Sequence, residues 1–263
     1  MCSSFKKRLI LSIAAARHDG SVSIYEEYNL LASVQLERLT RIKTDGDRIP
    51  TEAIQEALEI AGIQKSNISH VCLSRNRFPY EWFNFSQFPI SYRFKRWIEA
   101  SLRKLAGKNH ILTSTKECRR AGHTDVLSIF KKKRFLADNG FSEDAHLFFY
   151  DHHYAHVLPC LFHNPEWQDC LLYSADGGGD TGFYSFRYFN GKTIEDIFGG
   201  EEWVLKDAPI ASLAFAYGTA TIALGYKMNR HEGKLTGLAA SGEPTLIEAL
   251  KQKFSVQDDG QIA

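Results

Sequence analysis

Short apolar segments at the start of the chain constrain the fold more than any other feature. Residues 8–14, 21–25 and 30–34 have the composition of strands and are separated by polar turns. Residues 51–61 follow as a helix, and residues 70–74 read as another short buried strand. We therefore predict an α/β fold that opens in the order strand, strand, strand, helix, strand.

The predicted helix at residues 51–61 has signals at both ends. Its sequence, Thr-Glu-Ala-Ile-Gln-Glu-Ala-Leu-Glu-Ile-Ala, is amphipathic. We expect Thr51 to be the capping residue at its start, and Gly62 lies where the helix should end.

The second half of the chain predicts more strands and two hairpins. A strand at 147–150 leads into a histidine-rich helix, and strands at 171–174 and 182–189 flank a glycine-rich segment. We expect residues 176–181 to form the tight turn of the first hairpin. Asn190-Gly191 should form the next turn, with positive φ at both positions. A helix at 210–224 and a glycine-rich loop at 232–242 complete this half.

Residues 80–145 differ in character, being helical in tendency, aromatic and basic. Between Arg93 and Arg134 there are thirteen Lys or Arg residues against three acidic ones. Three interpretations stay open: a solvated helical insertion whose aromatic residues are core, a positive flank that guides an anionic substrate, or nucleic-acid binding. No nucleic-acid-binding motif accompanies the charge, so we expect no nucleic acid as a partner.

The composition indicates an ordinary globular protein. The 263 residues are 44% hydrophobic and 24% charged, with a net charge of +1. Five scattered cysteines without a CxxC motif favour a reduced, cytoplasmic protein over a disulfide scaffold. No apolar run approaches the length of a membrane span, and we expect no membrane partner.

Two imidazoles and a carboxylate predict a metal site. His152 and His156 would stand one turn apart on one face of a helix, a spacing at which both can bind one ion. Asp176 follows an apolar strand, and Gly177, Gly178 and Gly179 let a backbone or phosphate come close. A hydrogen-bonded histidine pair is the alternative reading. His153 lies on a different face and should be structural or support the site.

Several motifs resemble, in the same order, those of the O-carbamoyltransferases of nodulation-factor and antibiotic biosynthesis, which include the tobramycin and cephamycin enzymes. These are a His-Asp-x-Ser loop, an acidic-Arg-x-x-Arg segment before an Ile/Phe-Pro pair, an HHxxHA motif, a DGxG hairpin and a GEGKxMGLAxxG loop. In this chain the five motifs lie, in the same order, at residues 18–21, 37–41 with 49–50, 152–157, 176–179 and 231–242. Val157, His231 and Thr236 depart from the pattern, and residues 80–145 match poorly.

The resemblance implies an actin/sugar-kinase-like (ribonuclease-H-like) α/β domain with a helical insertion at about 80–145. It also implies that His152, His156 and Asp176 hold a divalent metal (Fe, Mn or Zn) and that His18 is a general base. The glycines at 177–179, with Glu232 and Lys234, would contact the substrate. In that family a further C-terminal domain makes carbamoyl adenylate from ATP and carbamoyl phosphate, and the carbamoyl group then passes to a hydroxyl of a small-molecule acceptor.

Other readings of these residues stay open. His18 could cap a turn, and Lys234 could be a solvated lysine. The family is longer than this chain, so we expect a truncated domain whose missing C-terminal part a second chain could supply. Besides a carbamoyltransferase, a non-catalytic actin-like protein that binds a nucleotide or metal and a metal-dependent hydrolase fit the same residues.

Overall fold

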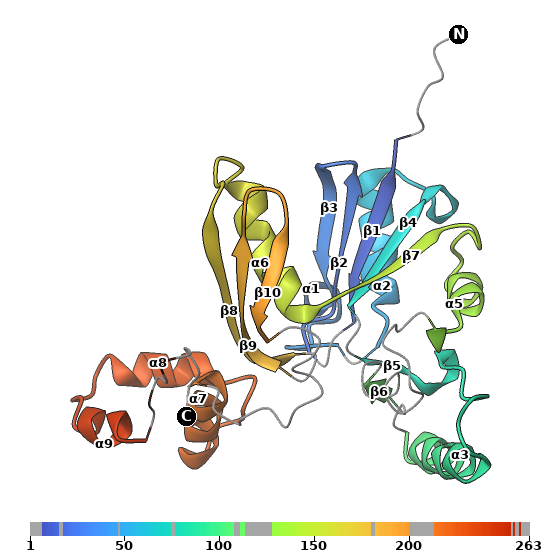
Figure 1. Cartoon of the computed structure of the whole chain (residues 1–263). Helices are drawn as coiled ribbons and strands as arrows, with labels where there is room; N and C mark the ends of the chain where they lie inside the picture. Colours follow the sequence, from blue (N-terminus) through green and yellow to red (C-terminus); the bar gives the residue numbers. More distant parts are fainter. Residues whose placement is uncertain are drawn as a thin grey trace. The chain divides into compact units, whose positions relative to one another are not determined.

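The computed structural model describes residues 7–15, 18–46, 48–74, 77–107, 111–113, 128–179, 182–199 and 213–253, together with 255 and 258. The chain divides into two compact units, Met1–Asp151 and His152–Ala263. Figure 1 labels the elements of each unit. The α/β class predicted from the sequence is confirmed, because each unit combines a sheet with helices.

The first unit is built on a five-stranded sheet in the order β3-β2-β1-β4-β7 (Figure 1). Strands β1, β2 and β3 form an antiparallel meander, and β4 and β7 continue the sheet parallel to β1. The predicted elements follow one another along the chain in the expected order, and each predicted strand of this sheet lies within two residues of its observed bounds. These are β1 (Leu9–Ala14), β2 (Ser21–Glu26), β3 (Asn29–Gln35), β4 (His70–Ser74) and β7 (His146–Tyr150).

Helix α2 (Thr51–Ala61) packs against β2 and β3, after the short α1 (Leu36–Thr40). Gly62 ends α2 with a φ of 67°, as predicted. The predicted cap is wrong, since Pro50 holds the N-cap position and no side chain caps the helix. Thr51 is already helical, and its hydroxyl donates to the Glu52 carboxylate at 3.0 Å instead.

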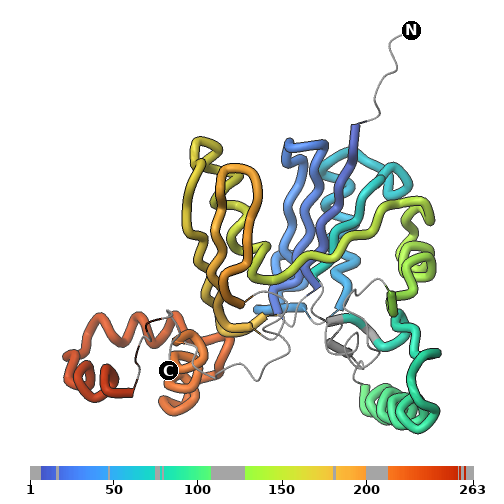
Figure 2. Tube along the Cα trace, in the orientation of Figure 1, coloured from blue at the N-terminus to red at the C-terminus, as the bar shows by residue number. Residues whose placement is uncertain are grey.

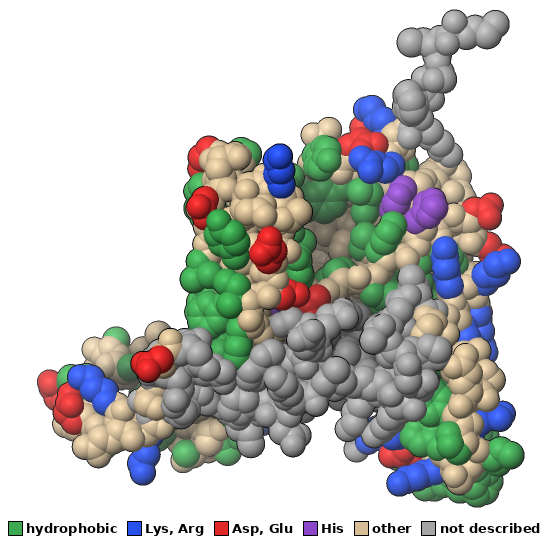
Figure 3. Space-filling model, in the orientation of Figure 1, with side chains coloured by type: hydrophobic (Ala, Val, Ile, Leu, Met, Phe, Trp, Pro, Cys, Tyr) green, Lys and Arg blue, Asp and Glu red, His purple; other side chains and the backbone are tan. Residues whose placement is uncertain are grey.

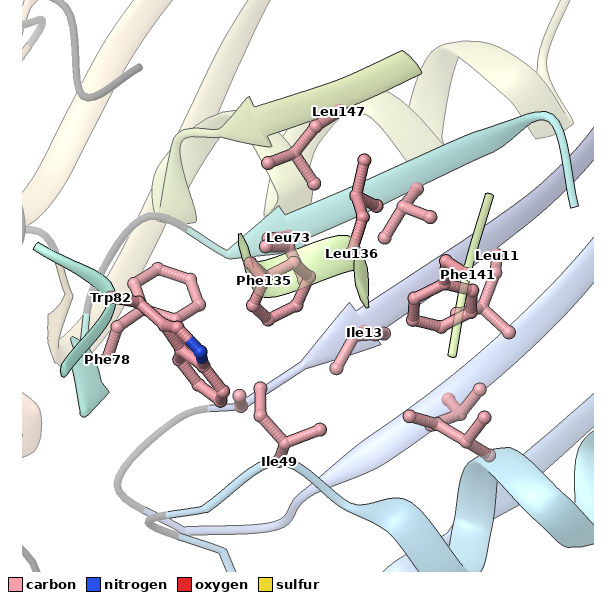
Figure 4. Packing of buried hydrophobic residues seen from close by; sticks show 14 of the residues in the cluster. Leu11, Ile13, Ile49, Leu73, Phe78, Trp82, Phe135, Leu136, Phe141 and Leu147 are labelled. Atoms are coloured by element: carbon pink, nitrogen blue, oxygen red, sulfur yellow. The ribbon is translucent and has the colours of Figure 1, made fainter. Parts of the chain in front are cut away.

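In its described residues, the basic segment between β4 and β7 contains three helices and two short strands. It also contributes to the core, because its aromatic side chains pack with β1, β4 and β7 (Figure 4). Phe78, Trp82, Phe83 and Phe135 are all buried there. The elements of the segment are β5 (Arg77–Pro79), η2 (Tyr80–Trp82), α3 (Ile90–Leu105), β6 (Ile111–Thr113) and α5 (Lys132–Asp138). The short helix η1 (Lys65–Asn67) lies before β4.

The interpretation that the aromatic residues of the insertion belong to the core is wrong for helix α3. Phe94 and Trp97 are 60% and 59% exposed, and no residue of α3 is buried. Figure 3 shows hydrophobic and basic side chains together over this helix. The described aromatic residues of the insertion thus divide into a buried group on either side of α3 and the exposed Phe94 and Trp97 on it.

The second unit holds a three-stranded antiparallel sheet in the order β10-β9-β8. The trace reverses between β8 and β9 and again between β9 and β10 (Figure 2). Its elements are α6 (His152–His163), β8 (Cys170–Gly179), β9 (Gly182–Phe189), β10 (Ile194–Phe198), α7 (Leu213–Ala223), α8 (Glu232–Ala239) and α9 (Ile247–Lys251).

Both predicted hairpins exist, but their turns differ from expectation. Strand β8 continues to Gly179, which pairs with Gly182, so Asp176 lies within the strand at an irregular stretch. Asp180 and Thr181 lie outside the described residues. At the second hairpin only Gly191 has positive φ, at 84°. The Asn190 side chain explains this, since its Oδ1 accepts the N–H groups of Lys192 and Thr193 at 3.1 and 2.9 Å.

The segment predicted as a glycine-rich loop at 232–242 is mainly helix α8. Leu235, Leu238 and Ala239 favour a helix, and Glu232 in the first turn suits the positive end of the helix dipole. The helix expected at 210–224 is α7, although residues 210–212 lie outside the described part. In the described part of the chain, no helix has the length and apolar character that crossing a bilayer requires.

Candidate metal centre

Helix α6 places two imidazoles at the start of the second unit. His152 is its first residue, and His156 stands one turn further along the same face. Their Nε2 atoms lie 3.1 Å apart, and their ring centroids are 4.6 Å apart. The predicted pairing of these two side chains on one helix face is therefore present.

Strand β8 brings a carboxylate to the same place. Asp176 Oδ2 lies 2.6 Å from His152 Nε2 and 3.4 Å from His156 Nε2. One ligand atom from each residue lies within 4.8 Å of the others, so this group could hold a metal ion. The structure thus brings together the three residues that the sequence had suggested as ligands.

The spacing of these atoms fits a metal ion. Ligands held at about 2.0–2.2 Å from a divalent ion are roughly 3 Å from one another, which matches the 2.6, 3.1 and 3.4 Å separations. Two imidazoles and one carboxylate leave further coordination positions open, a set that suits Fe(II) and is compatible with Zn or Mn.

The electrostatics favour an ionised Asp176. The hydrogen bond from His152 lowers the pKa of this carboxyl well below its usual value, although partial burial opposes the shift. The Gly177 N–H donates to Oδ1 and lowers the pKa further, as do the charges of both histidines. A carboxylate that stays ionised is ready to bind a cation.

Gly179 makes room for the first histidine. A Cβ at this position would lie 2.0 Å from Cδ2 of His152, so a larger residue cannot occupy it without moving the imidazole. A Cβ at Gly177 would meet nothing within 4 Å, although it is only two residues away. One of the three predicted glycines therefore has a clear steric role at the site. Gly178 has a φ of 137°, which favours glycine for its backbone.

His153 lies beside His152, with their ring centroids 5.3 Å apart, and belongs to a buried polar chain. The residue is 2% exposed, and its Nδ1 lies 2.9 Å from the Ser174 hydroxyl. Ser174 in turn lies 2.9 Å from the Ser185 hydroxyl of β9. His153 therefore anchors α6 to the sheet, in agreement with its predicted supporting role.

The polar chain continues to a buried arginine. Arg187 is 1% exposed and donates to the Ser185 hydroxyl. Its Nε donates to Asp196 at 2.6 Å, and its guanidinium carbon lies 4.4 Å from the ring centre of Tyr154 in α6. Arg187 thus contacts the ligand-bearing helix both directly and through the two serines.

The other predicted site residues lie in different settings. His18 belongs to the first unit, where its Nδ1 lies 2.7 Å from Asp19 Oδ2 and its side chain is half exposed. Glu232 and Lys234 lie on α8 in the second unit. Burial would raise the pKa of Glu232, but backbone N–H donors around the start of α8 lower it overall. Lys234 Nζ lies 5.9 Å from the ring centre of Tyr226.

Sequence reasoning missed Ser174, Ser185 and Arg187. The alternation of side chains along a strand could have placed Ser174 on the same face as Asp176. No feature of the sequence indicates that Arg187 is buried, because arginine on a strand is usually exposed.

The chain belongs to the carbamoyltransferase N-terminus family, whose model matches residues 9–259. It is 25% identical to an uncharacterised protein of Synechocystis, sll1178, over 92% of this chain and 36% of that protein. It is 24% identical to the nodulation protein NolNO of Sinorhizobium fredii, over 90% of this chain and 30% of the relative. It is also 28% identical to the uncharacterised protein MJ1058 of Methanocaldococcus jannaschii, over 45% of this chain and 21% of that one. The chain therefore spans about a third or less of the length of these relatives.

Proposed function

We propose that this chain is the acceptor-carbamoylating part of an O-carbamoyltransferase. It would transfer a carbamoyl group from carbamoyl adenylate to a substrate hydroxyl in a metal-dependent reaction. Membership of the carbamoyltransferase family supports carbamoyl transfer in general. The convergence of His152, His156 and Asp176 carries the metal-dependent part of the proposal.

The three ligand atoms would hold the ion on the α6–β8 face of the second unit. A bound divalent ion would supply Lewis-acid chemistry, polarising a carbonyl or phosphoryl oxygen. Gly179 would keep His152 in place, and Gly177 and Gly178 would leave backbone space for the adenylate. Lys234 would pair with its phosphate, and the Glu232 carboxylate would accept from its hydroxyls.

His18 would accept the proton of the substrate hydroxyl. A hydroxyl is a poor nucleophile, and a neutral imidazole can accept its proton near neutral pH. Because Nδ1 of His18 faces Asp19, Nε2 would accept the proton while the carboxylate orients the ring. General-base assistance typically contributes about 10²- to 10⁴-fold in rate, so His18→Ala should slow turnover by that amount while the protein stays folded.

We further propose that the two units correspond to the halves of an actin/sugar-kinase-like fold. Each sheet contains a three-stranded antiparallel meander, β3-β2-β1 in one and β10-β9-β8 in the other. ATP and carbamoyl phosphate would be consumed by an adenylate-forming domain, in a longer chain or in a second chain.

The test supplies ATP and labelled carbamoyl phosphate to this chain, alone and mixed with the adenylate-forming domain of a family member. A panel of sugar hydroxyl acceptors is included, and pyrophosphate and carbamate ester are measured. We expect pyrophosphate to require the added domain, and carbamate ester to require this chain, a divalent ion and intact His152. Equal ester formation by His152→Ala would contradict the proposal. Metal-dependent ester cleavage without ATP would favour a hydrolase instead.

A further inference from the structure

The first turn of α6 is attached to β8 at two alternate positions of the strand. Ser174 and Asp176 alternate along β8, so their side chains lie on the same face. Asp176 contacts His152 and His156, and Ser174 contacts His153. These contacts together set how α6 lies along the strand, and hence where the two ligand nitrogens stand.

Arg187 of β9 lies behind this attachment. It is one of the largest fully buried side chains in the described part of the chain and carries a charge. A buried charge is costly unless it is paired and hydrogen-bonded. Here Asp196 pairs with Nε, Ser185 accepts from the other side of the guanidinium, and the Tyr154 ring covers its face. These contacts fix its orientation.

The fixed guanidinium reaches α6 by two routes. One is the stacking contact with Tyr154, which lies between the metal-ligand positions 152 and 156. The other runs from Arg187 to the Ser185 hydroxyl, then to Ser174 and to His153. Both routes end within the turn that carries His152 and His156, and neither uses Asp176.

We propose that Arg187 is a positioning residue of the metal centre, which holds the ligand-bearing turn of α6 against β8 through Tyr154 and through Ser185, Ser174 and His153. The inference rests on the proposed function, because it assumes that His152, His156 and Asp176 bind a cation. Arg187 would act through its contacts with Asp196, Ser185 and Tyr154.

The experiment compares wild type with Arg187→Met, which keeps a long side chain but removes the charge and the donors. Co²⁺ is the probe, and its dissociation constant is measured from its visible absorption. Loss of a group that orients metal ligands typically weakens binding about 10- to 100-fold, and we expect a loss in this range. Arg48→Met is the matched control, since Arg48 is ion-paired with Glu52 in the other unit and should leave the Co²⁺ affinity unchanged.

A second readout uses no metal. In the metal-free protein, amide hydrogen exchange of residues 152–157 should be faster in Arg187→Met than in wild type, since the turn is less firmly held. If wild type bound no Co²⁺, the metal-centre proposal would fail, and the exchange rates would still decide whether Arg187 holds α6. Unchanged Co²⁺ affinity together with unchanged exchange in folded Arg187→Met would overturn the inference.

Ser185→Ala provides an alternative if Arg187→Met does not fold. It removes one hydroxyl in the middle of the chain of hydrogen bonds and leaves the guanidinium paired with Asp196. Ser185→Ala should also weaken Co²⁺ binding and speed the amide hydrogen exchange of residues 152–157, in both cases by less than Arg187→Met. No change in either would reject the route through the serines.

Discussion

At the scale of single residues, the site depends on contacts that spacing along the chain reveals only in part. The i,i+4 spacing of His152 and His156 and the position of Asp176 after an apolar strand were enough to predict that the three could meet. The need for glycine at 179 could not be predicted. It depends on the irregular pairing between β8 and β9, which brings the backbone against the His152 ring.

The steric role of Gly179 predicts the effect of one added methyl group. Gly179→Ala would place a Cβ 2.0 Å from the His152 ring, so the imidazole must move away from Asp176. We expect weaker metal binding and a loss of stability of about 1–3 kcal/mol, typical of overpacking. Gly177→Ala is the control, because its Cβ enters open space. Metal titration and thermal denaturation check both variants, and equal behaviour of the two would contradict the steric account.

The lowered pKa of Asp176 predicts how stability depends on pH. A carboxyl with a lower pKa in the folded state stabilises the protein above its unfolded pKa, about 3.9. This contribution is lost as the pH falls through the folded value. The side chain is 38% exposed, so we expect less than about 1 kcal/mol.

Urea denaturation of metal-free wild type and Asp176→Asn tests this linkage. The variant should be less stable at neutral pH, and the difference should shrink below about pH 4. Asp144→Asn, at an exposed turn of the first unit, is the matched control variant. A stability difference for Asp176→Asn that stays constant with pH would count against the hydrogen bond from His152 as its cause.

At the scale of elements, apolar periodicity predicted most strands correctly, and glycine caused the clearest error. The strands at 70–74 and 182–189 and helix α2 agree with the structure in both bounds. Gly233 and Gly237 predict a loop in the segment that begins at Glu232, yet its leucines and alanines make it helix α8. Glycine lowers helix propensity without forbidding a helix.

Two glycine substitutions with opposite expected effects on stability test these assignments. Gly62 ends α2 at a φ of 67° with open space around it, so Gly62→Ala should destabilise the protein by about 1 kcal/mol through backbone strain alone. Gly237 lies inside α8, also in open space, and Gly237→Ala should stabilise it by up to about 1 kcal/mol. Thermal denaturation measures the stability of both variants against wild type. Destabilisation by Gly237→Ala would mean that the segment is not helical in solution.

At the scale of the whole molecule, the chain represents a part of the relatives it resembles. It spans about a third or less of their length. The motifs predicted the family, and the family model that matches residues 9–259 confirms it. They could not predict the buried Arg187 chain, which depends on how β9 packs under α6.

The central claim is that His152, His156 and Asp176 bind one divalent ion. The most direct measurement is the metal content of the purified chain after loading with Fe²⁺, Mn²⁺ or Zn²⁺ and desalting. Wild type should retain about one ion per chain, and His152→Ala should lose it. His163→Ala, which removes an exposed imidazole at the far end of the same helix, should retain it. Full occupancy in His152→Ala would contradict the account.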